Sequence, residues 1–358
     1  MAKRKKRIII HWARFLTFLV IVVLILAMGI FLINLKDAGA SGNGSSASNS
    51  AKTVQLKDRN VIRGIRKIPA GYQKPAKKQG KVRLIHYDTT LIDGTGRTVR
   101  KTARVYLPYG YKKSKKYNIV YLVHGYGGHD YTYLGTNDDP RPFRNILDHM
   151  IQEGDIEPII LVTPTLTLEY TDYYTELNGM DHEIAHELME AVESKYSTYA
   201  EDTSEEGYRA SRNHRAFAGF SMGSSVTWRL LRDHADYAKY YLNMSMPLYY
   251  TESGYDEQLN TQSAQAIVNG IEASGVTAKD YKVFAASGTK DFMCKGTEQQ
   301  VEALAGYTKW FTKTSKGFDK GNIMFHAWKG REHHYYEGYP YLYNALIRFF
   351  KDDSKGSN

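Results

Sequence analysis

Short apolar runs alternate with helical patterns along the sequence from residue 81 onward. The runs 118–125 (NIVYLVHG) and 158–165 (PIILVTPT) are almost continuously apolar, which is typical of strands buried on both faces of a parallel sheet. Strands that alternate with helices indicate an α/β domain, because a crossover helix joins each parallel strand to the next. The sequence therefore predicts a mostly parallel central sheet with helices on both faces.

The expected elements follow one another closely. Strands are expected at 81–88, 102–109, 118–125, 158–165, 215–219, 240–250, 281–288 and 322–330. Helices are expected at 140–154, 180–196, 225–241, 297–311 and 339–350. In such sheets, functional groups lie on loops at the carboxyl ends of the strands.

The N-terminal part of the chain has a different character. Residues 15–35 form an apolar stretch of 21 residues without charge, and a helix of that length spans about 30 Å, the thickness of the hydrocarbon core of a bilayer. Residues 1–14 are strongly basic, so we expect them to be a cytoplasmic tail. The apolar stretch then acts as a transmembrane signal anchor that leaves the rest outside the cell. A signal peptide cleaved near Ala40 is the alternative, and it would release a secreted protein.

Residues 36–80 are expected to be a flexible linker and lead-in, and 81–353 the α/β domain. The net charge of +10 comes largely from the N-terminal tail, so charge does not imply a nucleic-acid partner. A second basic run, YKKSKKY at 111–117, is interpreted as a solvated turn. The oligomeric state cannot be inferred from the sequence.

The most specific motif is Gly219-Phe220-Ser221-Met222-Gly223, a G-x-S-x-G between a short apolar strand and an amphipathic helix. This is the setting of a nucleophile elbow, in which a tight turn lifts the serine above the sheet. A Cβ at either glycine would clash in such a turn. Ser221 is therefore the predicted nucleophile.

A serine needs a base and an acid, and this fold supplies them in the order serine, acid, histidine. Asp291 follows an apolar strand and a Gly-Thr turn, a setting that Asp256 and Asp280 lack. His333 and His334 both lie in the loop after the last strand. We expect His333 to be the base, with His334 as the alternative.

An oxyanion needs two backbone N–H donors. One is expected from Met222, the residue after the nucleophile, and the other from Tyr126 in the glycine-rich loop 123–130. His124 is expected to shape this loop through hydrogen bonds.

Five segments together resemble the esterase D and feruloyl esterase group of α/β-hydrolases, carbohydrate esterase family one. They are NIVYLVHGYGG (118–128), ELMEAVESKYST (187–198), HRAFAGFSMGS (214–224), ASGTKDF (286–292) and GREHH (330–334). The resemblance implies an α/β-hydrolase fold, no cofactor, and a serine esterase that removes feruloyl or acetyl groups from polysaccharide. The family commonly has Asp or Asn after its histidine, where this chain has His334.

Tyrosine-rich segments at 129–135 and 168–179 are expected to be loops beside the site. Their aromatic rings could stack on sugars or on a hydroxycinnamoyl group. The candidate substrate-binding residues are Tyr131, Tyr133, Tyr173 and Tyr174.

Three other functions compete with esterase activity. One is an acyltransferase of the mycolyltransferase type, which would pass the acyl group to a cell-envelope sugar or lipid. Another is a catalytically silent surface binding module. The third is a zinc hydrolase, suggested by H-E-x-x-H at His182, Glu183 and His186.

The zinc interpretation is disfavoured by the helical pattern around this motif. At 100° per residue, both histidines project from the face opposite the apolar one, together with Glu190 and Glu193, in a helix capped by Asn178 or Asp181. No metal site is therefore expected.

Overall fold

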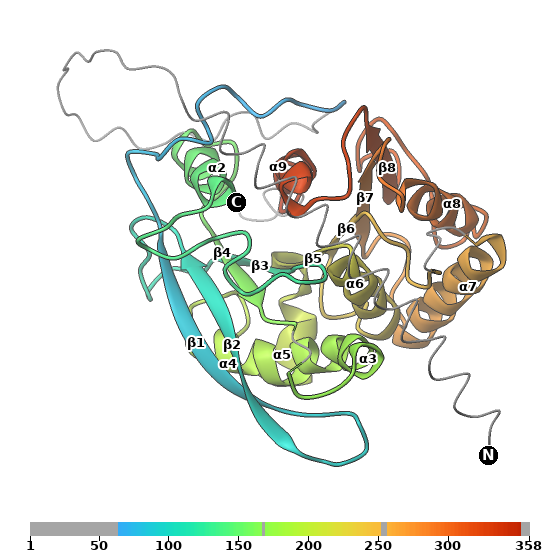
Figure 1. The fold of residues 1–358 in the computed structure, drawn as a ribbon, viewed down its shortest axis with the longest axis horizontal. Coiled ribbons are helices and arrows are strands. Elements are labelled where there is room, and N and C mark those ends of the chain that lie inside the picture. Colours follow the sequence, from blue (N-terminus) through green and yellow to red (C-terminus); the bar gives the residue numbers. More distant parts are fainter. Residues whose placement is uncertain (1–63, 167–168, 252–255, 352–358) are drawn as a thin grey trace, which may run out of the picture. The chain divides into compact units, whose positions relative to one another are not determined.

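The computed structural model describes residues 64–166, 169–251 and 256–351. They contain one sheet of eight strands in the order β1-β2-β4-β3-β5-β6-β7-β8 (Figure 1). The strands are β1 (Lys81–Thr90), β2 (Thr98–Leu107), β3 (Asn118–Val123), β4 (Ile159–Pro164), β5 (Arg215–Phe220), β6 (Tyr240–Met244), β7 (Lys282–Gly288) and β8 (Ile323–Trp328). β1 and β2 are antiparallel to their neighbours, and the other six strands run parallel. The predicted mostly parallel sheet is confirmed.

Helices cover both faces of this sheet, as predicted (Figure 1). α2 and α9 pack on one face, and α3, α6, α7 and α8 on the other. Successive residues of β3 point to opposite faces of the sheet. Tyr121 packs on the face covered by α3, α6, α7 and α8, and Leu122 packs on the face covered by α2 and α9. The helices are α2 (Pro142–Gln152), α3 (Tyr173–Glu183), α4 (Met189–Glu193), α5 (Glu205–Ala210), α6 (Met222–Asp233), α7 (Glu257–Ser274), α8 (Cys294–Ala305) and α9 (Tyr339–Leu346), and a π-helical turn at Ile184–Leu188 joins α3 to α4.

The strand register brings the ends of several strands to one edge of the sheet. Val123 pairs with Gly219, and Gly288 pairs with Trp328, so β3, β5, β7 and β8 end close together. The loops that follow these strands carry the predicted functional residues. The sheet therefore brings together chain segments that are up to about two hundred residues apart.

Several helices differ from the prediction, and α8, for example, ends at Ala305 rather than at residue 311. α3 begins at Tyr173 because the carboxylate of Asp172 accepts hydrogen bonds from two N–H groups of the first turn, so neither Asn178 nor Asp181 is the cap. The segment 168–179 is consequently not all loop. α6 ends at Asp233, before the predicted end at 241.

α7 was not predicted, because its sequence is mostly polar and its apolar stripe is narrow. Two boundary signals were present nonetheless. The Asp256 carboxylate caps its first turn, and Gly275 ends it with φ +74°.

The predicted tail 1–14, the anchor 15–35 and residues 36–63 of the linker lie outside the described residues. Within the described part, none of the helices combines the length and apolar character needed to cross a bilayer. Residues 64–80 of the lead-in lie against the domain: the Arg66 N–H donates to Asn344 at 2.9 Å, and Tyr72 stacks on His149.

Candidate active site

Ser221 occupies a sharp turn between β5 and α6. Its backbone has φ 56° and ψ −121°, a strained conformation for a residue with a side chain. A Cβ at Gly219 would lie 1.9 Å from the carbonyl oxygen of Gly223, and one at Gly223 would lie 2.2 Å from that of Val123. Only glycine fits at either position, so the predicted nucleophile elbow is present.

A chain of two hydrogen bonds joins Ser221 to His333 and Asp291. His333 Nε2 lies 2.8 Å from Ser221 Oγ, and His333 Nδ1 lies 2.8 Å from Asp291 Oδ1. Ser221 and Asp291 are almost fully buried. An imidazole held in this way can take the serine proton while the carboxylate stabilises the resulting imidazolium. The structure thus brings together the three residues predicted as nucleophile, acid and base.

The loops after β7 and β8 hold the acid and the base in place. Lys290 N–H donates to Arg331 O at 3.0 Å, which ties the two loops together. A Cβ at Gly288 would lie 2.1 Å from that same Arg331 oxygen, so this close approach requires glycine. Asp291 Oδ1 also accepts from Met293 N–H at 2.8 Å. The carboxylate is therefore oriented before any substrate arrives.

Two aromatic rings flank the His333 imidazole. The Phe220 ring centroid lies 4.9 Å from it and that of Phe292 lies 4.4 Å from it. Phe292 is 57% exposed. The hydrogen bonds to Ser221 and to Asp291 are both made by His333. His334, the alternative base, directly follows His333 in the sequence but stacks on Tyr336 instead.

The loop after β3 lies directly against the serine. A Cβ at Gly125 would be 3.0 Å from Ser221 Cβ. His124 is buried and holds this loop: its Nε2 accepts from Leu166 N–H at 3.0 Å, so its Nδ1–H donates to Gly125 O at 2.7 Å. Burial lowers the pKa of His124 to about 4, so the ring stays neutral. The predicted role of His124 in shaping the loop is confirmed.

The two predicted oxyanion donors belong to the two segments that meet at Ser221, the start of α6 and the loop after β3. Met222 is the first residue of α6, and first-turn N–H groups have no acceptor within their helix. Tyr126 directly follows Gly125, and its side chain is 45% exposed. The helix N-terminus adds partial positive charge at the same point. The arrangement suits an acyl-transfer reaction at Ser221.

The model of the Esterase family matches residues 98–336. The chain belongs to this family. Endo-1,4-beta-xylanase Y of Acetivibrio thermocellus is 38% identical over 287 residues, which is 80% of this chain and 25% of that protein. The esterase thus spans about a quarter of the length of this curated relative.

Solved structures agree with this assignment. The feruloyl esterase module from Clostridium thermocellum, in complex with sinapinate, is 35% identical with a TM-score of 0.69, over 82% of this chain and 96% of that one. A CE1 ferulic acid esterase from Anaeromyces mucronatus is 18% identical with a TM-score of 0.57, over 84% and 99% of the two chains, and shares the fold. The resemblance to the feruloyl esterase group is confirmed, and the protein is a serine carboxylic ester hydrolase with an α/β-hydrolase fold.

The four candidate tyrosines of the esterase differ in accessibility. Tyr133 is fully buried and packs edge-on against Phe143 in the core, so its predicted contact with substrate is wrong. Tyr131 is 38% exposed and stacks on the His129 ring, and Tyr174 is 67% exposed. The side chain of Tyr173 lies outside the described part of the structure. Periodicity could not reveal the burial of Tyr133, because its loop folds back onto α2.

The H-E-x-x-H motif is divided between solvent and core. His182 is exposed, whereas Glu183 is buried and accepts hydrogen bonds from Tyr87 Oη and Lys101 Nζ, each at 2.5 Å. Burial raises the pKa of Glu183 to about 7. The Glu183 carboxyl group therefore forms its contacts inside the domain. Across residues 64–166, 169–251 and 256–351, no three His, Cys, Asp or Glu side chains are grouped so that they could hold a metal.

Glu193, expected on the exposed face of this helix, is also buried. Its carboxylate forms an ion pair with Arg215 at 2.7 Å and accepts from Tyr121 Oη at 3.0 Å. The prediction failed because this side of the helical run faces Tyr121 of β3 and Arg215 of β5, which cover the Glu193 side chain. A buried arginine on β5 then supplies the opposite charge.

Proposed function

We propose that this esterase removes hydroxycinnamoyl groups, of which feruloyl is the type, from polysaccharide through an acyl-enzyme on Ser221. The observation that carries this proposal is the hydrogen-bond chain from Asp291 through His333 to Ser221. The solved relative described as a feruloyl esterase module holds sinapinate, which supports an aromatic acyl group. Acetyl groups on the same kind of polymer are the second substrate class.

The reaction proceeds in two steps. Ser221 Oγ attacks the ester carbonyl carbon while His333 Nε2 takes its proton, and Asp291 stabilises the imidazolium. Backbone N–H groups of Met222 and Tyr126 bind the oxyanion. The sugar hydroxyl leaves with the proton from His333. Water then attacks the acyl-enzyme and gives its proton to the same imidazole, which passes it to Ser221 Oγ as the carboxylic acid product is released.

Exposed aromatic side chains beside the serine favour a hydroxycinnamoyl over an acetyl group. Phe292 lies against His333 and Tyr126 follows the glycine that touches Ser221. Both rings are about half exposed, at 57% and 45%. An aromatic acyl group can stack on such rings, whereas an acetyl group offers little area to them.

We further propose that the esterase acts outside the cell, where polysaccharide is found. The basic residues 1–14 and the apolar residues 15–35 support a membrane anchor with the catalytic domain exported. Cleavage near Ala40 would instead release the domain. Protease accessibility of intact cells, followed with an antibody to the domain, distinguishes export from retention.

A substrate panel tests the proposed reaction. Methyl ferulate, a feruloylated arabinoxylan oligosaccharide, a short acetyl ester and acetylated xylan are each given to the wild type and to Ser221→Ala. We expect feruloyl esters to be hydrolysed fastest and the variant to be inactive on all four. Full activity in Ser221→Ala would refute the mechanism, and acetyl preference would refute the acyl group. Transfer of the acyl group to an added acceptor sugar, rather than to water, would identify an acyltransferase.

A further inference from the structure

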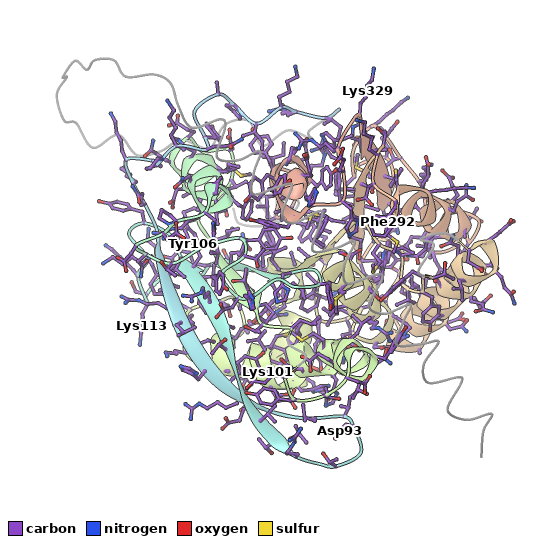
Figure 2. All side chains as sticks on the ribbon, viewed as in Figure 1. Asp93, Lys101, Tyr106, Lys113, Phe292 and Lys329 are labelled. Atoms are coloured by element: carbon purple, nitrogen blue, oxygen red, sulfur yellow. The ribbon has the colours of Figure 1, made fainter. Side chains whose placement is uncertain are left out.

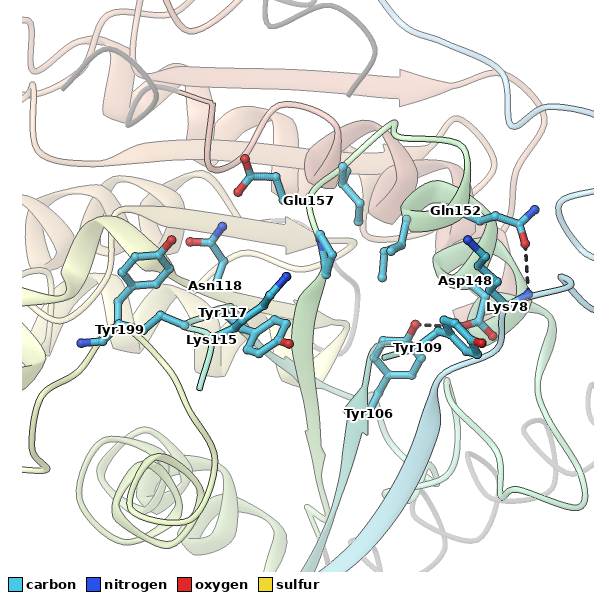
Figure 3. Close-up of a pocket in the computed structure, with 14 residues that line it drawn as sticks. Lys78, Tyr106, Tyr109, Lys115, Tyr117, Asn118, Asp148, Gln152, Glu157 and Tyr199 are labelled. Atoms are coloured by element: carbon cyan, nitrogen blue, oxygen red, sulfur yellow. Dashed lines mark hydrogen bonds between the residues drawn. The ribbon is translucent and has the colours of Figure 1, made fainter. Parts of the chain in front are cut away.

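A cavity opens at the opposite end of the sheet from Ser221. It has a volume of about 400 Å³ and lies at the start of β3 and β4, between the end of α2 and Tyr199 (Figure 3). The catalytic loops follow the carboxyl ends of the parallel strands. Because β3 has six residues, roughly 20 Å of strand separates the two ends. We call this space the amino-end cavity. Its lining includes Lys78, Tyr109, Lys115, Asp148, Glu157 and Tyr199.

The walls of the amino-end cavity are rich in tyrosine. Four of its fourteen lining residues are tyrosines, and the Tyr109 ring is 60% exposed. Tyr199 is held in place by a parallel stack on His214, with ring centroids 3.4 Å apart. An exposed ring such as Tyr109 and a ring of fixed orientation such as Tyr199 offer flat apolar surfaces, which suit the C–H faces of sugar rings.

A buried acceptor without a partner also lines this cavity. Asp148 is 1% exposed, and its Oδ1 accepts from Gly80 N–H and from Tyr106 Oη, each at 2.7 Å. Its Oδ2 is buried and has no hydrogen-bond partner among the described residues. Buried acceptors are nearly always paired, and an unpaired one is costly. Because this oxygen is itself inaccessible, the Asp148 carboxyl group forms part of the wall and does not contact a ligand in the cavity.

The rim carries positive charge that is only partly balanced. Lys115 and Lys116 come from the basic run 111–117, and Lys78 comes from the lead-in. Lys116 pairs with Glu201, while no ion pair is formed by Lys78 or Lys115 within the described residues. Two carboxylates, Asp148 and Glu157, also line the cavity and would repel a closely spaced phosphate backbone. A ligand with many hydroxyls and sparse carboxylates fits this mixture better than a nucleic acid.

We propose that the amino-end cavity is a second polysaccharide-binding site, which takes a short segment of a neutral sugar chain carrying uronic acid groups. Tyr109 stacks on a sugar ring, and Lys78 and Lys115 bind uronate groups of the chain. The site would hold the polymer while esters elsewhere along it reach Ser221. Saccharide binding in the amino-end cavity does not depend on ester hydrolysis, so it can be tested with a protein that lacks esterase activity.

Calorimetric titration of the Ser221→Ala protein tests this site. The three probes are a neutral xylo-oligosaccharide, the same oligosaccharide with a glucuronic acid group, and a single-stranded RNA of matched length. We expect the glucuronic acid form to bind more tightly than the neutral one, and both more tightly than RNA. Adding Tyr109→Ala should weaken both saccharides about tenfold, since a lost aromatic stack is worth about 1 kcal/mol. Adding Lys115→Ala should weaken only the acidic one.

Lys113→Ala is the matched control, because Lys113 belongs to the same basic run and is exposed (Figure 2) but does not line the cavity. It should leave every affinity unchanged. With Ser221 intact, Tyr109→Ala should hydrolyse methyl ferulate at the wild-type rate, which shows that the domain is folded. The proposal would be overturned by saccharide binding that survives Tyr109→Ala, by the absence of saccharide binding, or by tighter binding of RNA.

Discussion

His333 Nδ1 lies 2.8 Å from one oxygen of the Asp291 carboxylate, and Asp291 is almost completely buried. The second oxygen, Oδ2, has no hydrogen-bond partner among the described residues. The Asp291 carboxylate therefore faces the His333 imidazole through Oδ1, and the Met293 N–H donates to the same oxygen. This geometry holds His333 in the tautomer whose Nε2 faces Ser221.

Asp291→Asn should lower kcat for methyl ferulate by about 10⁴-fold, because an amide can hold the imidazole in the wrong tautomer. The measurement is kcat at saturating ester, with circular dichroism to show an intact fold. Asp256→Asn is the control, since Asp256 only caps α7 and asparagine caps equally well. Equal losses in the two variants would contradict the assignment of Asp291 as the acid.

Phe292→Ala should reduce kcat/KM for methyl ferulate about tenfold relative to a short acetyl ester, since loss of an aromatic contact is worth about 1 kcal/mol. The ratio between the two esters is the informative quantity, because Phe292 also packs on His333 and its loss can slow both reactions. Tyr336→Ala removes an exposed ring that stacks on His334 and should leave the ratio unchanged. An unchanged ratio in Phe292→Ala would exclude a role in acyl selection.

Glu193→Gln should destabilise the domain by about 3–5 kcal/mol, because it leaves the Arg215 guanidinium buried without a counter-charge. Both side chains are at most 1% exposed. The free energy of unfolding is obtained from urea titration. Glu205→Gln, which breaks an exposed ion pair with Arg209, should cost at most about 1 kcal/mol. Similar effects in the two variants would refute a special role of the buried pair.

Glu183 makes stability depend on pH in a definite direction. Its folded-state pKa is raised by burial from 4.5 to about 7, so the folded protein retains a proton that the unfolded chain has released. Stability from this group is therefore greatest below pH 4.5 and falls as the pH rises to about 7. In Glu183→Gln, the free energy of unfolding should fall less steeply over this window. Glu190→Gln, at an exposed position of the same helical run, should keep the wild-type slope.

Gly223→Ala should abolish activity, because the new Cβ would lie 2.2 Å from the Val123 carbonyl oxygen and would disrupt the tight turn at Ser221. Gly275→Ala is a milder change, since no atom lies within 4 Å of a Cβ there and only the positive φ is unfavourable. We expect that variant to retain turnover and lose about 1 kcal/mol of stability. Assays of methyl ferulate hydrolysis and urea unfolding on both proteins separate the two effects. Normal turnover by Gly223→Ala would contradict the tight elbow.

Local patterns predicted much of this protein. Apolar runs such as 118–125 predicted the parallel strands, because strands buried on both faces have no polar side. The G-x-S-x-G motif predicted the elbow at Ser221, since only glycine fits beside so tight a turn. Asp291 could be chosen because it directly follows a strand that ends at the same edge of the sheet. In each case the structure or role of a residue is indicated by residues within a few positions of it in the sequence.

Only the tertiary structure decided the remaining points, because each depends on contacts between distant segments. His333 and His334 are adjacent and share one setting in sequence, yet only His333 reaches both Ser221 and Asp291. Tyr133 resembles an exposed loop tyrosine, but its ring is buried against α2. Glu183 lies in a metal-like motif, but Lys101 of a strand some eighty residues earlier pairs with it. Sequence periodicity describes one element at a time, whereas burial and pairing are set by the elements packed against it.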